Sequence, residues 1–108
     1  MESQFLWGTV EMLVLKVVSQ GSSYGYEIAQ TVGQHSNGYF DLKEGSLYPA
    51  LHRMEQQKLL SSFWQEADGR RRKYYKLTSA GAKALAAKEK QWQAFSSGVQ
   101  GVLQANYV

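Results

Sequence analysis

The residues with the clearest chemical signature form a basic cluster in the second half of the chain. Arg70, Arg71, Arg72, Lys73 and Lys76 fall within seven residues that contain no acid. Guanidinium and ammonium groups gathered in this way attract a polyanion and can neutralise its phosphates. A charge run can also be no more than a solvated surface, so its meaning depends on the elements that position it.

A second group of side chains suited to DNA lies on a predicted helix from about Glu44 to Lys58. Leu47, Leu51 and Met54 have the spacing of its buried side. Pro49, the only proline, is best tolerated in a first turn, which moves the expected start to Gly45 or Ser46. The outer side then presents groups that can hydrogen-bond to base edges in a major groove: Ser46, Tyr48, His52, Arg53 and Gln56.

The basic cluster itself falls in a predicted hairpin. Leu60, Phe63 and Trp64 lie in a strand-like segment, and Ala67-Asp68-Gly69 predicts a tight turn. The residues after the turn alternate between Arg71, Lys73, Tyr75 and Leu77 on one face and Arg70, Arg72, Tyr74 and Lys76 on the other. An arginine-tipped hairpin can contact phosphates or insert a guanidinium into a narrow minor groove.

The remaining elements are helices. Apolar residues at helical spacing predict a first helix that is covered on more than one face: Val10, Met12, Leu13, Val14, Leu15, Val17 and Val18. We expect Ser23 to cap a second helix from about Tyr24 to His35, and Thr78 to cap a last helix whose end is weakened by Gly98 and Gly101. The predicted fold class is mainly α with a small β-hairpin wing. Residues 1–78 would form a winged helix-turn-helix and residues 79–108 a C-terminal dimerisation helix, in one compact unit.

The composition argues against an enzyme. The chain has 108 residues, a net charge of +3 and no cysteine. It shows no paired-carboxylate spacing, no glycine-rich phosphate loop and no cluster of metal ligands, and His35 and His52 fall on different predicted helices. We therefore expect no catalytic residues, no metal and no cofactor. Without a signal peptide or an apolar run long enough for a bilayer, we expect a cytoplasmic protein with no membrane partner.

Three stretches resemble the PadR family of transcriptional regulators. They are Tyr24-Gly25-Tyr26-Glu27-Ile28, the run from Glu44 to Glu55, and the run from Gly69 to Thr78. The similarity extends from about Trp7 to Leu103, and the single C-terminal helix is typical of the short subfamily. The resemblance implies a dimeric winged-helix repressor that binds palindromic operator DNA and often releases it when a small molecule binds.

By position, the resemblance places Tyr48, His52 and Arg53 on the recognition helix and Arg70 to Lys73 on the wing. Tyr24 could donate to a phosphate near the positive end of the second helix, or it could pack as an ordinary aromatic residue. Four features depart from the family pattern: Ser46 for the usual threonine, Met54 for leucine, Gln57-Lys58 for a basic-glycine pair, and a tail that ends soon after Ala105.

The last predicted helix carries an apolar stripe. Leu85, Trp92 and Val99 recur every seven residues, with Phe95 and Val102 at intermediate positions. The stripe suits a homodimer seam with the first helix. Tryptophan at the position of Trp92 stacks planar hydrophobic ligands in some similar proteins, which suggests a small aromatic effector. Dimer packing alone explains Trp92 equally well, and Trp7 is a weaker candidate for the same pocket.

Two other functions fit a winged helix. The domain could bind proteins without DNA, because fold alone does not determine function. It could bind structured RNA, for which Tyr74 or Tyr75 would supply a stacking surface. DNA is favoured because a protein-binding module has little need of the acid-free run from Arg70 to Lys73. Alternation along the strand also turns one of the two tyrosines inward.

Overall fold

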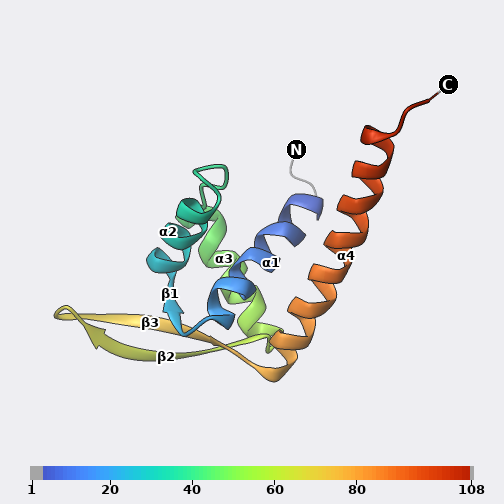
Figure 1. Ribbon diagram of the computed structural model, residues 1–108. Helices are drawn as coiled ribbons and strands as arrows, with labels where there is room; N and C mark the ends of the chain where they lie inside the picture. The colour runs from blue at the N-terminus through green and yellow to red at the C-terminus, as the bar shows by residue number, and fades with distance from the viewer. Residues whose placement is uncertain (1–3, 108) are drawn as a thin grey trace.

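The computed structural model describes residues 4–107, and of residues 4–7 it describes the backbone alone. The order of elements matches the predicted fold class (Figure 1). The elements are α1 (Gln4–Ser19), β1 (Ser23–Tyr24), α2 (Gly25–His35), α3 (Glu44–Gln56), β2 (Leu60–Ala67), β3 (Arg70–Leu77) and α4 (Ser79–Gln104). Helix α1 runs through the centre, with α2 and α3 on one side and α4 on the other, while the β2–β3 hairpin projects away from the helices.

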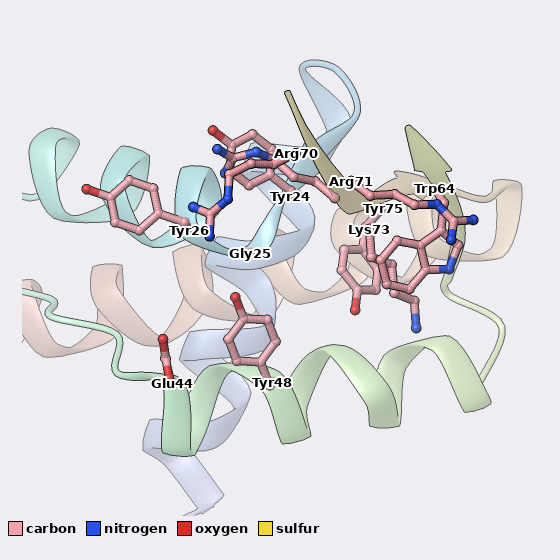
Figure 2. A pocket seen from close by; sticks show the side chains of 11 residues that line it. Tyr24, Gly25, Tyr26, Glu44, Tyr48, Trp64, Arg70, Arg71, Lys73 and Tyr75 are labelled. Carbon is pink, nitrogen blue, oxygen red and sulfur yellow. The ribbon is translucent and has the colours of Figure 1, made fainter. Parts of the chain in front are cut away.

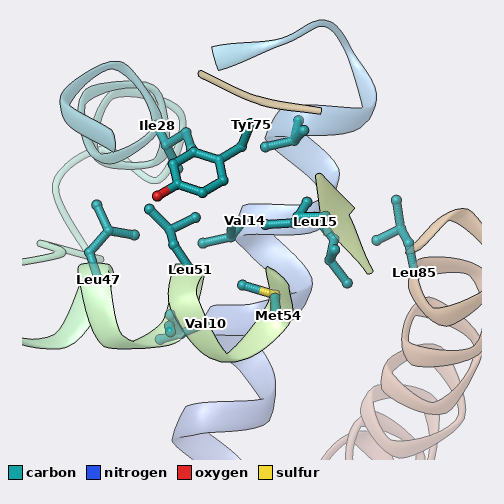
Figure 3. Close-up of a cluster of buried hydrophobic side chains, with 12 residues drawn as sticks. Val10, Val14, Leu15, Ile28, Leu47, Leu51, Met54, Tyr75 and Leu85 are labelled. Atoms are coloured by element: carbon teal, nitrogen blue, oxygen red, sulfur yellow. The ribbon is translucent and has the colours of Figure 1, made fainter. Parts of the chain in front are cut away.

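The core forms where α1, α2, α3 and the base of the hairpin meet (Figure 3). Val14 and Leu15 are neighbours in α1 and both are fully buried. Successive helical residues point about 100° apart, so α1 is covered on two faces, as the sequence predicts. The predicted stripe of α3 is also confirmed, because Leu47, Leu51 and Met54 are buried.

The three strands form an antiparallel sheet in the order β1-β3-β2. Ala67 pairs with Arg70, which leaves Asp68 and Gly69 as a two-residue turn. Both turn residues have positive φ angles, 54° and 75°, as the favoured hairpin turn requires. The predicted wing is therefore present, and its register carries the arginines from the tip toward the helices.

Strand β1 explains why the predicted cap at Ser23 is wrong. Ser23 pairs with Tyr75 in the sheet, and the N-cap residue of α2 is Tyr24, which makes no side-chain cap. The Ser23 hydroxyl donates instead to the Glu27 carboxylate at 2.8 Å. Pairing with β3 keeps Ser23 extended and one residue too far from the helix to cap it.

The predicted bounds of α3 also need correction. The helix begins at Glu44, so Pro49 lies in the second turn, where its exposed ring costs the helix one backbone hydrogen bond. The helix ends at Gln56 and not at Lys58, because Lys58 has a φ of 66°. The Leu59 N–H then donates to the Met54 carbonyl at 2.9 Å, which closes the helix end.

Helix α4 is about 39 Å long at 1.5 Å per residue. Thr78 caps it as predicted, accepting a hydrogen bond from the Gly81 N–H at 2.9 Å. Gly98 and Gly101 do not end the helix, which continues to Gln104. Its buried residues, Gly81 and Leu85, lie in the first two turns, and the distal part extends beyond the body of the protein (Figure 1).

Candidate nucleic-acid interface

A groove of about 640 Å³ lies between the start of α2, the first half of α3 and the wing. Figure 2 shows aromatic and basic side chains converging on it from these three elements. The lining residues are Tyr24, Gly25, Tyr26, Glu44, Tyr48, Trp64, Arg70, Arg71, Arg72, Lys73 and Tyr75. The predicted DNA-binding residues Tyr24, Tyr48 and Arg70 to Lys73 are therefore brought together.

Tyr48 reaches across the groove toward the start of α2 (Figure 2). Its ring lies so close to Gly25 that a Cβ atom on Gly25 would be 2.6 Å from both Cε1 and Oη of Tyr48. Only glycine at this position allows that approach without a shift of the ring. The lack of a side chain at Gly25 thus determines how closely Tyr48 of α3 can approach the start of α2.

Aromatic rings hold two of the wing arginines. The Arg72 guanidinium carbon lies 4.3 Å from the centroid of the Tyr24 ring, and that of Arg71 lies 5.1 Å from the centroid of Trp64. Tyr24 is itself packed edge-on against Tyr74, with ring centroids 5.3 Å apart. Tyr24 is therefore both a packed aromatic residue and part of the groove.

One nitrogen of the Arg72 side chain lacks a hydrogen-bond acceptor within the described part of the protein. Within residues 4–107, its Nε atom is buried and has no hydrogen-bond partner. A guanidinium stacked on a ring still presents donor edges to a carboxylate or phosphate. The stacking therefore restricts the conformations of Arg72 without occupying its hydrogen-bonding capacity.

Glu55 connects α3 to the wing. Its carboxylate accepts a hydrogen bond of 2.5 Å from the Ser62 hydroxyl and pairs with the Lys73 ammonium at 3.2 Å. The Ser62 hydrogen bond, helped by Lys73, lowers the pKa of Glu55 below its usual value, so the carboxylate is charged at neutral pH. Burial raises the pKa of Tyr75, beside Lys73, so that hydroxyl stays protonated. These contacts fix the angle of the hairpin relative to α3.

The other predicted residues of α3 lie outside this groove. His52 is exposed on the outer face, and Ser46 is half-buried at the edge of α3. Arg53 is also at that edge, where its Nη2 atom lies 3.5 Å from a carboxylate oxygen of Glu11 on α1. The predicted DNA-binding set is thus divided between the groove and the outer face of α3.

The apolar stripe of α4 is shorter than predicted. Leu85 is buried in the hydrophobic core with residues of α1, so it cannot contribute to a surface seam. Trp92, Phe95, Val99 and Val102 are exposed. The rings of Trp92 and Phe95 have centroids 5.9 Å apart and line a hollow of about 340 Å³ with residues of α1. The side chain of Trp7 lies outside the described residues.

Trp64 and Glu55 are site residues that the sequence analysis did not assign. Trp64 is exposed and lines the groove, while its neighbour Phe63 stacks on Tyr74 on the other face of the hairpin. The pair Phe63-Trp64 in an alternating strand was the available signal, since two adjacent aromatic residues cannot both point inward. No comparable local pattern indicates the role of Glu55.

Among the residues that the structure describes, no helix has the length and apolar character needed to cross a membrane. Within the same residues, no group of three or more histidine, cysteine, aspartate or glutamate side chains is arranged to hold a metal ion.

The fold and the groove together define a winged helix-turn-helix protein with a basic wing. The chain belongs to the transcriptional regulator PadR-like family, whose family model matches residues 14–87. It is 33% identical over 82 residues to the transcriptional regulator Rv3488 of Mycobacterium tuberculosis, covering 76% of this chain and 74% of that protein. The protein is therefore a DNA-binding transcriptional regulator and not an enzyme.

Solved structures agree with this assignment. A PadR-like transcriptional regulator from Bacillus cereus superposes with a TM-score of 0.83 at 34% identity, covering 96% of this chain and 100% of that one. The protein smu.1704 of Streptococcus mutans superposes with a TM-score of 0.85 at 36% identity, covering 100% and 98%. The match includes α4, so the long helix belongs to the shared architecture.

Proposed function

We propose that the protein is a homodimeric repressor that binds a palindromic operator, one subunit on each half-site. In this proposal α3 enters the major groove with Ser46, Tyr48, His52 and Arg53, and the wing follows the adjacent backbone with Arg70 to Lys73. Tyr24 contacts a phosphate at the start of α2. The observation that carries the proposal is the convergence of Tyr48 with the wing arginines on one groove.

The exposed stripe of α4 supports the dimer. Trp92, Phe95, Val99 and Val102 are between 41% and 63% exposed and present an apolar surface along the distal part of the helix. A second subunit would remove this surface from water, at about 25 cal/mol for each square ångström buried. The C-terminal helix then sets the spacing of the two recognition helices.

The hollow beside Trp92 and Phe95 supports an effector site. Its walls include Thr9, Met12, Lys88 and Gln91, so an aromatic face lies beside polar groups that could orient a ligand. We propose a small planar hydrophobic molecule as the effector, stacked on Trp92. Quenching of Trp92 emission by a panel of planar aromatic dyes, measured in a Trp7→Phe/Trp64→Phe background that leaves Trp92 as the single tryptophan, tests this part. Emission unchanged across the panel would remove the effector from the proposal.

Operator binding is tested by titrating the protein onto its own promoter fragment and onto scrambled DNA of equal length, across a salt series. Each phosphate contact contributes about −0.9 to the slope of log K against log salt. The Arg70→Ala/Arg71→Ala variant removes two exposed cations per subunit, so its slope should be shallower by about 3 to 4 per dimer. Lys83→Ala/Lys90→Ala removes the same charge from exposed positions on α4 and should leave the slope nearly unchanged.

Binding to the promoter that is no tighter than binding to the scrambled fragment would contradict a specific regulator of that gene. Run-off transcription from the promoter fragment tests repression, and a transcript that rises with added protein would contradict it. Analytical ultracentrifugation at micromolar concentration tests the dimer. Val99→Glu places a charge on the stripe and should shift the dimer toward monomer, and a wild-type protein that is a stable monomer would contradict the proposal. Ala94→Glu, on the other side of the same helix, is the matched control.

A further inference from the structure

Glu11 connects three helices through one carboxylate. Arg53 of α3 approaches one oxygen with its Nη2 atom at 3.5 Å, and Lys88 of α4 approaches the other oxygen with its Nζ atom at 3.6 Å. The Glu11 side chain is 16% exposed, against 43% for Arg53 and 28% for Lys88. The acid is thus the sheltered centre of the cluster, and the arginine is the member most open to solvent.

Arg53 lies on α3, the helix that would meet DNA in the proposed function, and its side chain is 43% exposed, so two anions can compete for it. One is the fixed carboxylate of Glu11, and the other is a DNA phosphate. A carboxylate that holds the guanidinium must release it, at least in part, before the phosphate can bind. Glu11 therefore opposes DNA binding by Arg53, and the strength of that opposition depends on what else neutralises Glu11.

Lys88 supplies that second neutralising charge. With Lys88 nearby, the negative charge of Glu11 is shared between two cations, and its hold on Arg53 is weaker. Lys88 also lines the hollow beside Trp92 and Phe95. A ligand or a subunit movement in that hollow would displace Lys88 first among the three charged groups.

We infer that Glu11 is a positioning residue through which α4 controls Arg53, with Lys88 as the intermediate group. Pairing of Lys88 with Glu11 weakens the hold of Glu11 on Arg53 and favours DNA binding by Arg53; when Lys88 moves away, Glu11 holds Arg53 more strongly. The inference rests on the proposed DNA-binding function, and it adds a route from the α4 hollow to the recognition helix that uses three side chains.

Substitutions that remove the charge of Glu11 or of Lys88 should have opposite effects on binding of the full-length protein to its promoter fragment. Glu11→Gln keeps the shape of the side chain and removes its charge, so the dissociation constant should fall about threefold per subunit, or about tenfold per dimer. Lys88→Met should raise it by a similar factor. Glu89→Gln and Lys90→Met make the same charge changes elsewhere on α4 and should have little effect; Glu89 pairs with Lys16 of α1 and not with α3.

An Arg53→Gln background separates this route from a general charge effect. In that background Glu11→Gln and Lys88→Met should behave like their controls, because the group that they act on is gone. Released Arg53 should also add phosphate contacts, so Glu11→Gln should steepen the salt slope by up to about 2 per dimer. A purely structural role for Glu11 would change the melting temperature but not this slope.

The possible results are distinct. The inference would be overturned, with the proposed function left intact, if Glu11→Gln lowers the dissociation constant equally in the wild-type and Arg53→Gln backgrounds. The same holds if Glu11→Gln does not lower the dissociation constant although the wild type binds its promoter. A wild-type protein with no salt-dependent DNA binding would overturn both. If Glu11→Gln lowers the melting temperature, Lys88→Met still decides the question, because its predicted effect has the opposite sign.

Discussion

Gly25→Ala should weaken DNA binding without unfolding the protein. The added Cβ atom would lie 2.6 Å from Cε1 and Oη of Tyr48 and 2.8 Å from Cζ, whereas carbon atoms in contact are normally about 3.5–4.0 Å apart. The ring must therefore move by about 1 Å. Tyr48 is 44% exposed, so it can rotate outward into solvent and leave the core undisturbed.

The expected effect of Gly25→Ala on the free energy of unfolding is smaller than its expected effect on DNA binding. Alanine favours a helix over glycine by about 0.5–1 kcal/mol, which offsets much of the cost of moving the ring, so the free energy of unfolding should change by less than about 1 kcal/mol. A hydrogen bond from the Tyr48 hydroxyl to a phosphate is worth about 1.5 kcal/mol, since the acceptor is charged. Its loss would weaken operator binding about tenfold per subunit.

Fluorescence anisotropy with the promoter fragment measures the binding change, and urea unfolding measures stability. Gly33→Ala is the matched control in the same helix, because its Cβ atom would meet only the Phe40 carbonyl oxygen at an ordinary 3.7 Å. In a Tyr48→Ala background, Gly25→Ala should no longer affect binding. A Gly25→Ala protein that is folded and binds as tightly as the wild type would refute the role given to Tyr48.

Three further predictions concern stability. Gly81→Ala should destabilise the fold by about 2–3 kcal/mol in urea, because the new Cβ atom would overlap the backbone carbonyl oxygen of Leu59; Gly98→Ala, in open space, should not. Lys58→Gly should stabilise the protein by about 1 kcal/mol, because Lys58 has a φ of 66°, and an unchanged urea midpoint would contradict this. The lowered pKa of Glu55 contributes stability that is present above its usual value of 4.5 and is lost as the pH falls through its folded value. Glu55→Gln should therefore lose stability at pH 7 and show a smaller further loss on acidification, and unfolding curves measured from pH 7 to pH 3 test this.

Local patterns in the sequence predicted most of the fold. Helical spacing identified the buried faces of α1 and α3, and Asp68-Gly69 located the turn of the wing because both residues tolerate a positive φ. The exact limits of α3 did not follow from the same rules. Pro49 and Lys58 both take positions that their average preferences disfavour, and tertiary packing outweighs those preferences.

Contacts between distant segments were beyond what the sequence could show. A heptad stripe indicates which side of a helix is apolar, but it does not distinguish the core of one subunit from a seam between two, which is why Leu85 was misplaced. Strand β1 forms only because β3 is available to pair with it. Glu11 and Glu55 acquire their roles from partners on other elements, so no local spacing marks either acid.

The cations of the proposed interface fall into two groups that should act differently on DNA. Arg71 and Arg72 lie on aromatic rings, which restrict their conformations without accepting hydrogen bonds from them, so a phosphate can bind without displacing a carboxylate. Arg53 and Lys73 are paired with carboxylates, which a phosphate must displace in part. The wing arginines should therefore supply a constant affinity, whereas the contribution of the carboxylate-paired cations can be raised or lowered. Because the acid that holds Arg53 also contacts Lys88 of α4, this adjustable part is the one that α4 can reach.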